Sequence, residues 1–190
     1  RIFMETGKFN ISNLVLGSML FSTGLVLPLV TMQIQTIGKM LLPMHLPVLL
    51  SGLVLGPFYG VVIGFLLPLT RSFLFGMPIM MPSAICMAFE LSTYGFVSGF
   101  LYQSSSQKYM VNVYKAVFPA MIVGRIIWGA VSVVIFGMIG KNFTFQMFIS
   151  GAFITAIPGV LLQLILIPAI MVALSKGHLI HFVVREKALN

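Results

Sequence analysis

Four polar side chains interrupt apolar stretches of the sequence and are the first candidates for chemistry. Arg71 stands within VIGFLLPLTRSFLFGMP (residues 62–78), and Glu90, Arg125 and Gln163 stand in three other apolar stretches. A charged group deep in a membrane costs about 3 kcal/mol and almost always faces a bundle interior or a water-filled cavity. One glutamate neutralises only one of the two arginines. The remaining positive charge predicts an anionic ligand, and bracing of the helices by a glutamate–arginine pair is the structural alternative.

The composition decides the class of protein in which these residues work. Hydrophobic residues make up 59% of the 190 residues, only 7% are charged, and the mean hydropathy is +1.09. These values predict an integral membrane protein. The formal charge of +8 does not indicate a nucleic-acid-binding protein, because most of the basic residues flank apolar spans. No basic segment followed by a short apolar run and a small-residue cleavage site opens the chain, so we expect no signal peptide.

The apolar stretches predict an all-α integral membrane protein, a single compact bundle of six transmembrane helices over residues 1–190. About twenty apolar residues cross a bilayer core of roughly 30 Å. Proline ends a helix and glycine favours a turn, so Gly56-Pro57 should separate the second span from the third and leave the second short. The spans are predicted near residues 11–31, 45–56, 57–74, 82–103, 112–139 and 149–176.

The basic residues outside these spans predict the orientation. Seven Lys and Arg residues fall on one side of the predicted membrane and two on the other. Cytoplasmic loops carry the excess of Lys and Arg. The N and C termini are therefore predicted in the cytoplasm, and the loops 32–44, 75–81 and 140–148 outside.

The four polar residues fall at similar depths in this topology. Counted from the predicted cytoplasmic ends, Arg71 lies 14 residues deep, and Glu90, Arg125 and Gln163 each lie 13 residues deep. At 1.5 Å per residue this depth is roughly 20 Å from the inner face. The sequence therefore predicts that four helices bring polar groups to one level in the outer half of the bilayer.

Four more side chains are candidates for the same site. Tyr94 lies one helical turn beyond the glutamate, and Trp128 lies three residues beyond the second arginine. Both can pack on an organic ligand and offer a hydrogen bond, and both also suit core or interfacial positions. His45 opens the second span, where a helix-end role is the alternative. Gln35 lies in the 32–44 loop, which is predicted to close the site as a lid.

Several enzyme classes find no support in the residues. The chain contains no Asp, which excludes enzymes that depend on a pair of aspartates. It also contains no GxxxxGK[ST] motif, which excludes ATP binding through a P-loop. The histidines and the single Cys86 lack metal-ligand spacing, so neither a metal nor a cofactor is expected, and Cys86 reads as a packing residue. Ser72 has no positioned base in the sequence. An intramembrane enzyme is therefore possible but unsupported.

Two blocks of the chain carry a family resemblance. LPMHLPVLLSGLVLGPFYGVVIGFLLPLTRSFLFGMP and PSAICMAFELSTYGFVSGFLY, set within six spans, resemble the S components of energy-coupling factor (ECF) transporters. The resemblance covers nearly the whole chain and is most specific over residues 42–102. It implies a vitamin-binding subunit in the bacterial cell membrane. It also implies partners, namely a transmembrane coupling protein and two ATPase subunits that hydrolyse ATP.

The resemblance extends to a partner surface on the first helix. In this family a small-xxx-small face, often with two alanines, contacts the coupling protein. Ser18 and Ser22 stand at that spacing here, although serine departs from the alanine pattern.

Charge and resemblance together favour pantothenate as the vitamin. Two arginines and one glutamate suit a small anion with hydroxyl or amide groups, and LPLTRSFLFGMP and MAFELSTYG are most similar to the pantothenate-type S components. In this hypothesis Arg71 or Arg125 holds the carboxylate through charge-assisted contacts. Glu90 orients the other arginine or accepts a hydrogen bond from a ligand hydroxyl. Tyr94, Trp128 and Gln163 supply shape and hydrogen bonds.

Two alternatives stay open. The vitamin is riboflavin, pyridoxine or hydroxymethylpyrimidine in the first, since their pockets need no net charge. The second is a proton-coupled secondary transporter in which Glu90 carries the proton. Against the second, a glutamate between two arginines is expected to stay ionised near neutral pH.

Overall fold

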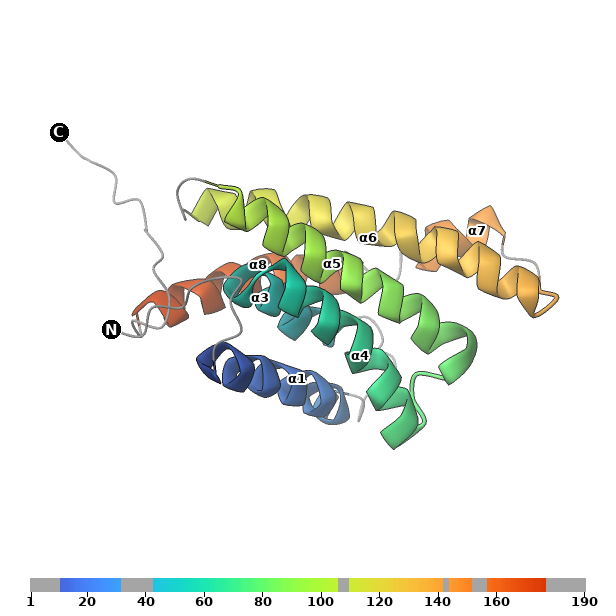
Figure 1. Ribbon diagram of the computed structural model, residues 1–190. Coiled ribbons are helices and arrows are strands. Elements are labelled where there is room, and N and C mark those ends of the chain that lie inside the picture. The colour runs from blue at the N-terminus through green and yellow to red at the C-terminus, as the bar shows by residue number, and fades with distance from the viewer. Residues whose placement is uncertain (1–10, 32–42, 106–109, 142–143, 152–156, 177–190) are drawn as a thin grey trace.

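Every element in the described part of the chain is a helix. The computed structural model describes residues 11–31, 43–105, 110–141, 144–151 and 157–176 (Figure 1). The elements are α1 (Ile11–Thr31), α3 (His45–Leu55), α4 (Pro57–Phe75), the π-helical turn η1 (Met80–Ala84), α5 (Ile85–Gln103), α6 (Met110–Met138), α7 (Phe145–Ile149) and α8 (Ile157–Lys176).

Five helical segments are long and apolar enough to cross a membrane. They are Ile11–Leu29, Pro57–Phe75, Met80–Gln103, Met110–Met138 and Ile157–Ser175. At 1.5 Å per residue the eleven residues of α3 extend only about 16 Å, roughly half of a bilayer core. The described residues therefore form five long candidate spans and one short helix, where the sequence predicts six spans. The last predicted span also begins later than expected, because α7 ends at Ile149 and α8 begins at Ile157.

A glycine and a proline separate α3 from α4, as the sequence predicts. Gly56 has φ 106° and ψ 173°, a backbone conformation that residues with a Cβ rarely adopt. Pro57 occupies the first position of α4, where its missing N–H costs no helical hydrogen bond. The short second helix thus ends inside the fold, and the chain reverses direction directly into α4.

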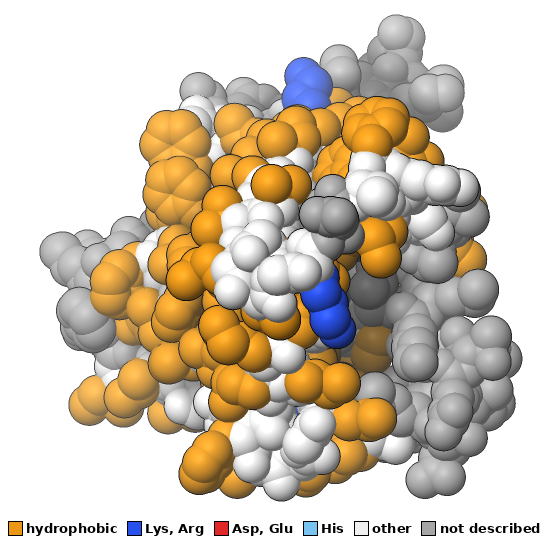
Figure 2. Space-filling view, turned by 90° about the vertical axis from the view of Figure 1, so that its right-hand side faces the viewer, with side chains coloured by type: hydrophobic (Ala, Val, Ile, Leu, Met, Phe, Trp, Pro, Cys, Tyr) orange, Lys and Arg blue, Asp and Glu red, His pale blue; other side chains and the backbone are white. Residues whose placement is uncertain are grey.

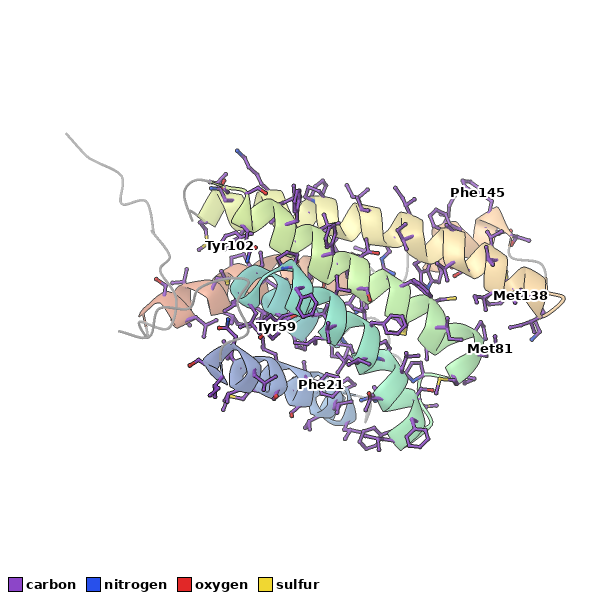
Figure 3. The ribbon with its side chains drawn as sticks, viewed as in Figure 1. Phe21, Tyr59, Met81, Tyr102, Met138 and Phe145 are labelled. Carbon is purple, nitrogen blue, oxygen red and sulfur yellow. The ribbon has the colours of Figure 1, made fainter. Side chains whose placement is uncertain are left out.

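The long helices alternate in direction between two ends of the bundle. The α4 and α6 helices run from one end to the other, and α5 and α8 return (Figure 1). Tyr102 marks one end, whereas Met81, Met138 and Phe145 gather at the other (Figure 3). We name these the Tyr102 end and the Met81 end. The Met81 end is the one that the sequence predicts to face outside.

Glycines bring α4 and α5 into backbone contact. A Cβ added at Gly60 would collide with the backbone of Gly95, and one added at Gly64 would collide with the backbone of Leu91 and Ser92. Membrane helices approach this closely only where small residues line the interface. These contacts fix the antiparallel register of the two helices.

The outer surface is largely apolar, as a surface in contact with lipid must be. Between 22% and 50% of each candidate span is buried inside the bundle, so much of every span faces outward. Hydrophobic side chains also dominate the Met81 end seen face-on, where Lys or Arg atoms are visible near the middle (Figure 2). Both observations agree with a protein whose surface lies largely in lipid.

Candidate functional site

Glu90 is the centre of a buried polar cluster. Its Oε1 accepts a hydrogen bond from the Tyr94 hydroxyl at 2.9 Å and lies 3.0 Å from Nη1 of Arg125. Nε2 of His45 lies 3.5 Å from the same oxygen. Glu90 is 2% exposed and His45 is 1% exposed. Side chains from α3, α5 and α6 thus meet at one carboxylate.

A glycine on α6 makes room for the cluster. A Cβ at Gly124 would collide with the ring of Tyr94, so the ring can pack this closely on α6 only because residue 124 is glycine. The ring centroids of Tyr94 and His45 are 5.2 Å apart. Because Gly124 precedes Arg125 directly, the same turn of α6 accepts the tyrosine ring and supplies the guanidinium. Gly124 and Arg125 therefore position the two α6 contacts of the cluster, one with the Tyr94 ring and one with the Glu90 carboxylate.

The start of α3 lies at the level of Glu90. His45 is the first residue of α3, and its N-cap residue, Met44, makes no side-chain cap. The first N–H groups of a helix carry partial positive charge and favour a nearby anion. The α3 helix therefore fills the interior only between the Tyr102 end and the Glu90 level. The α4, α5 and α6 helices continue beyond it to the Met81 end.

The ion pair keeps capacity for further hydrogen bonds. All three contacts of the carboxylate fall on Oε1, and Oε2 takes part in none of them. Nε of Arg125 has no hydrogen-bond partner among the described residues, although the side chain is 9% exposed. Buried polar atoms are normally hydrogen-bonded. The cluster can therefore give and accept hydrogen bonds when a polar ligand enters.

Arg71 lies at a different level from this cluster. The α4–α5 register places Glu90 opposite Phe65 and Arg71 opposite Ala84, six residues or roughly 9 Å nearer the Met81 end. The prediction that all four polar residues share one level is therefore wrong for Arg71. Equal residue counts from the span ends do not give equal depth, because glycine contacts shift the helices against one another.

The guanidinium of Arg71 joins α4 to α1. Its Nη1 donates to the carbonyl of Leu25 at 2.9 Å, and its Cζ lies 5.7 Å from the ring centroid of Phe75. Pro28 lies one turn farther along α1 and lacks the N–H that would bond Gly24. A proline opens the preceding turn, which leaves carbonyl oxygens there for outside donors. The bond of Arg71 to Leu25 holds α4 to α1 in this turn, while the charge of Arg71 stays buried, at 1% exposure.

The buried charges of the described residues do not balance. They are the guanidinium groups of Arg71 and Arg125 and the carboxylate of Glu90. The glutamate pairs with Arg125, and Arg71 is not among its partners. The described interior therefore carries one positive charge more than its own carboxylate neutralises.

Two other predicted site residues lie on α6 and α8, and a third lies outside the described residues. Trp128 stacks with Phe148, the fourth residue of α7, with ring centroids 6.3 Å apart. Gln163 is a buried residue of α8, at 1% exposure. Gln35 and most of the 32–44 loop lie outside the described residues. No pattern in the sequence points to Leu25, because its contacting group is a backbone carbonyl.

One face of α1 is unlike the rest of the surface. Ser18 and Ser22 are both exposed there, and the Ser18 hydroxyl donates to the carbonyl of its own helix at Leu14, at 2.9 Å. The opposite face packs through Gly17 and Gly24 against α3 and α4. The exposed face forms a shallow hollow lined by Leu14, Val15, Ser18, Met19, Ser22 and Thr23.

Comparison with known proteins decides the family. A family model described as ECF transporter, substrate-specific component, matches residues 12–184. The chain belongs to this family. No curated protein and no solved structure matches the chain. The S component is therefore an integral membrane protein that binds substrate for an ECF transporter, and the buried cluster is its candidate binding site.

Replacement of Arg125 by Met should destabilise the S component through Glu90. The carboxylate would then lack its cation while still buried, which costs about 3–5 kcal/mol in comparable pairs. Thermal unfolding in detergent would show a large fall in Tm. Lys115→Met removes an exposed charge from the same helix and should leave Tm nearly unchanged.

The double variant Glu90→Gln/Arg125→Met distinguishes the loss of the ion pair from the loss of packing by the Arg125 side chain. It should recover much of the lost stability, because no unpaired charge remains. A double variant as unstable as Arg125→Met would mean that the arginine acts through packing instead.

Proposed function

We propose that the chain is the S component for pantothenate or a closely similar carboxylate, delivering it to a separate coupling protein with two ATPase subunits. The carrying observation is the charge of the described interior, two guanidinium groups against one carboxylate. A ligand with one carboxylate completes the balance. Family membership supports the substrate-binding role, and the charge supports this class of substrate.

Arg71 is the group proposed to hold the ligand carboxylate. Arg125 already has a carboxylate partner in Glu90. Arg71 lies about 9 Å nearer the Met81 end than Glu90 does, measured along the axis of α5. Arginine binds carboxylates through two parallel N–H donors, and these bonds are stronger than neutral ones. A ligand that enters from the Met81 end meets Arg71 before it reaches the Glu90 cluster.

The Glu90 cluster is proposed to bind the polar, uncharged part of the ligand. Pantothenate carries an amide and two hydroxyl groups beside a branched apolar portion. Oε2 of Glu90 can accept a hydrogen bond from a hydroxyl, and Nε of Arg125 can donate one. Burial of these groups makes a fitted hydroxyl favourable and an unfitted apolar ligand unfavourable.

Calorimetric titration of the detergent-purified chain tests the proposed substrate. Among pantothenate, riboflavin, pyridoxine and folate, we expect tight binding of pantothenate alone. Arg71→Met should weaken it by about 10- to 150-fold, the effect of one charge-assisted hydrogen bond or more. Lys141→Met, which removes an exposed charge near the Met81 end, should bind as the parent does.

Other outcomes of that titration point elsewhere. Binding of a neutral vitamin, unaffected by Arg71→Met, would reduce Arg71 to a brace between α1 and α4. Binding of none of the four would overturn the proposed substrate and leave an S component for another small molecule.

The exposed face of α1 is proposed as the surface that meets the coupling protein. Its serines leave a shallow, smooth hollow on which another helix can pack closely. The double variant Ser18→Leu/Ser22→Leu should lose co-purification with the coupling protein and the ATPases, because added bulk fills the hollow. Ligand binding should persist, since both residues point away from the interior.

A matched variant controls for this experiment. Thr93→Leu replaces another hydroxyl that donates to its own helix, at Phe89, but on α5. It should assemble normally. Assembly of the serine double variant at the parent level would remove α1 from the interface.

A further inference from the structure

Large apolar side chains are exposed at the Met81 end, beyond the last turns of the long helices. The connection from α4 through η1 exposes Met77, Ile79, Met80 and Met81. Phe145 of α7 is 76% exposed and Ile79 is 66% exposed. Hydrophobic side chains cover most of this end when it is seen face-on (Figure 2). Exposed apolar surface of this extent marks an interaction surface.

The connection between α4 and α5 carries no charge. Between Arg71 and Glu90 the sequence contains no Asp, Glu, Lys or Arg, and residues 76–82 read GMPIMMP. A connection that faces water is normally built from polar turn residues. The other end of α5 follows this rule, because it continues into QSSSQK at residues 103–108. The two ends of α5 therefore suit different surroundings.

The length of α6 places the Met81 end at the level of lipid headgroups. Lys115 is exposed near the start of α6, and Lys141 is exposed just after its end. The helical rise of 1.5 Å per residue separates these two lysines by about 39 Å. A bilayer with both of its headgroup regions is about 40–45 Å thick. One lysine in each headgroup region accounts for this separation, so the Met81 end does not extend far into water.

The backbone limits how deeply this end can enter the bilayer. Residues 76–79 are not helical, and Met81 has φ −119° and ψ 126° within η1. Irregular backbone exposed to lipid does not occur in the hydrocarbon region, because its N–H and C=O groups need hydrogen-bond partners. Water supplies these partners in the headgroup region, where apolar side chains still reach the acyl chains. Backbone and side chains therefore favour the same level.

We infer that the Met81 end is a lipid-binding surface. Residues 76–81 and α7 lie in the headgroup region of the nearest leaflet, and their apolar side chains contact the start of the acyl chains. Lipid is the occupant because this surface continues into Phe73 and Leu74, exposed residues of the candidate span α4. Protein interfaces normally have a polar rim, and residues 72–89 offer no charged side chain for one. The inference goes beyond the proposed function and does not depend on the substrate.

Fluorescence quenching in lipid nanodiscs tests the inference. Ile79→Cys and Phe145→Cys are each labelled with a small thiol-reactive fluorophore and reconstituted in phosphatidylcholine and phosphatidylglycerol. The parent should take up no label, because its single cysteine, Cys86, is buried. A lipid with a nitroxide at the start of its acyl chain should quench both labels strongly, and iodide in the water should quench them weakly. The measured depth of each label should be about 5–10 Å inward from the headgroup surface.

Two further variants calibrate the measurement. Ser104→Cys replaces an exposed residue in the polar segment at the other end of α5, and iodide should quench its label strongly. Ile126→Cys replaces an exposed residue in the middle of α6. A lipid with the nitroxide near the end of its acyl chain should quench this label most.

Two results would overturn the inference. Quenching of the Ile79 and Phe145 labels by iodide as strongly as the Ser104 label would mean that the Met81 end faces water. Labels that neither iodide nor the nitroxide lipids quench would mean that protein covers this end. Neither result would change the outcome of the pantothenate titration, so this inference and the proposed function fail separately.

Discussion

The structure depends on a carboxylate that has been taken out of water. Glu90 lies in the membrane interior at 2% exposure, where an unpaired charge would be prohibitive. Three elements supply its partners: α6 gives a guanidinium, α5 its own tyrosine and α3 a histidine at its first residue. The short helix α3 begins at this carboxylate, with His45 as its first residue.

Glycines set the geometry that makes this pairing possible. Gly124 admits the ring of Tyr94 against α6, and the contact of Gly60 with Gly95 sets the height of α4 against α5. The same contact places Arg71 nearer the Met81 end than the ion pair, and there its guanidinium donates to the carbonyl of Leu25 on α1. The glycine contacts therefore also set the relative depth of the buried charges, because a shift of α4 along α5 would move Arg71 relative to the Glu90–Arg125 pair.

An interior built in this way suits binding better than catalysis. The cluster holds a satisfied ion pair together with a polar atom that retains hydrogen-bonding capacity, Nε of Arg125. These groups are fixed by helices instead of loops, so a ligand meets donors and acceptors that are already in place. Such preorganisation lowers the entropy cost of binding and favours high affinity.

Much of this could be predicted from the sequence, because the membrane imposes strong patterns. The long apolar segments, the break at Gly56-Pro57 and the importance of Glu90 and Arg125 all follow from hydropathy, proline chemistry and the cost of buried charge. The relative depth of Arg71 could not be predicted, since it depends on which glycines touch. The Leu25 carbonyl has no sequence signal either, because it is a backbone group.

The central claim is that the excess buried positive charge binds the carboxylate of a small organic acid. Its most direct test compares pantothenate with the corresponding alcohol, in which a CH₂OH group replaces the carboxylate, by titration of the same purified chain at fixed ionic strength. The account predicts that the carboxylate binds at least about 100-fold more tightly than the alcohol, the strength of charge-assisted bonds to a buried arginine. Equal affinity for the two compounds would contradict it, because the carboxylate would then gain nothing from the buried guanidinium groups.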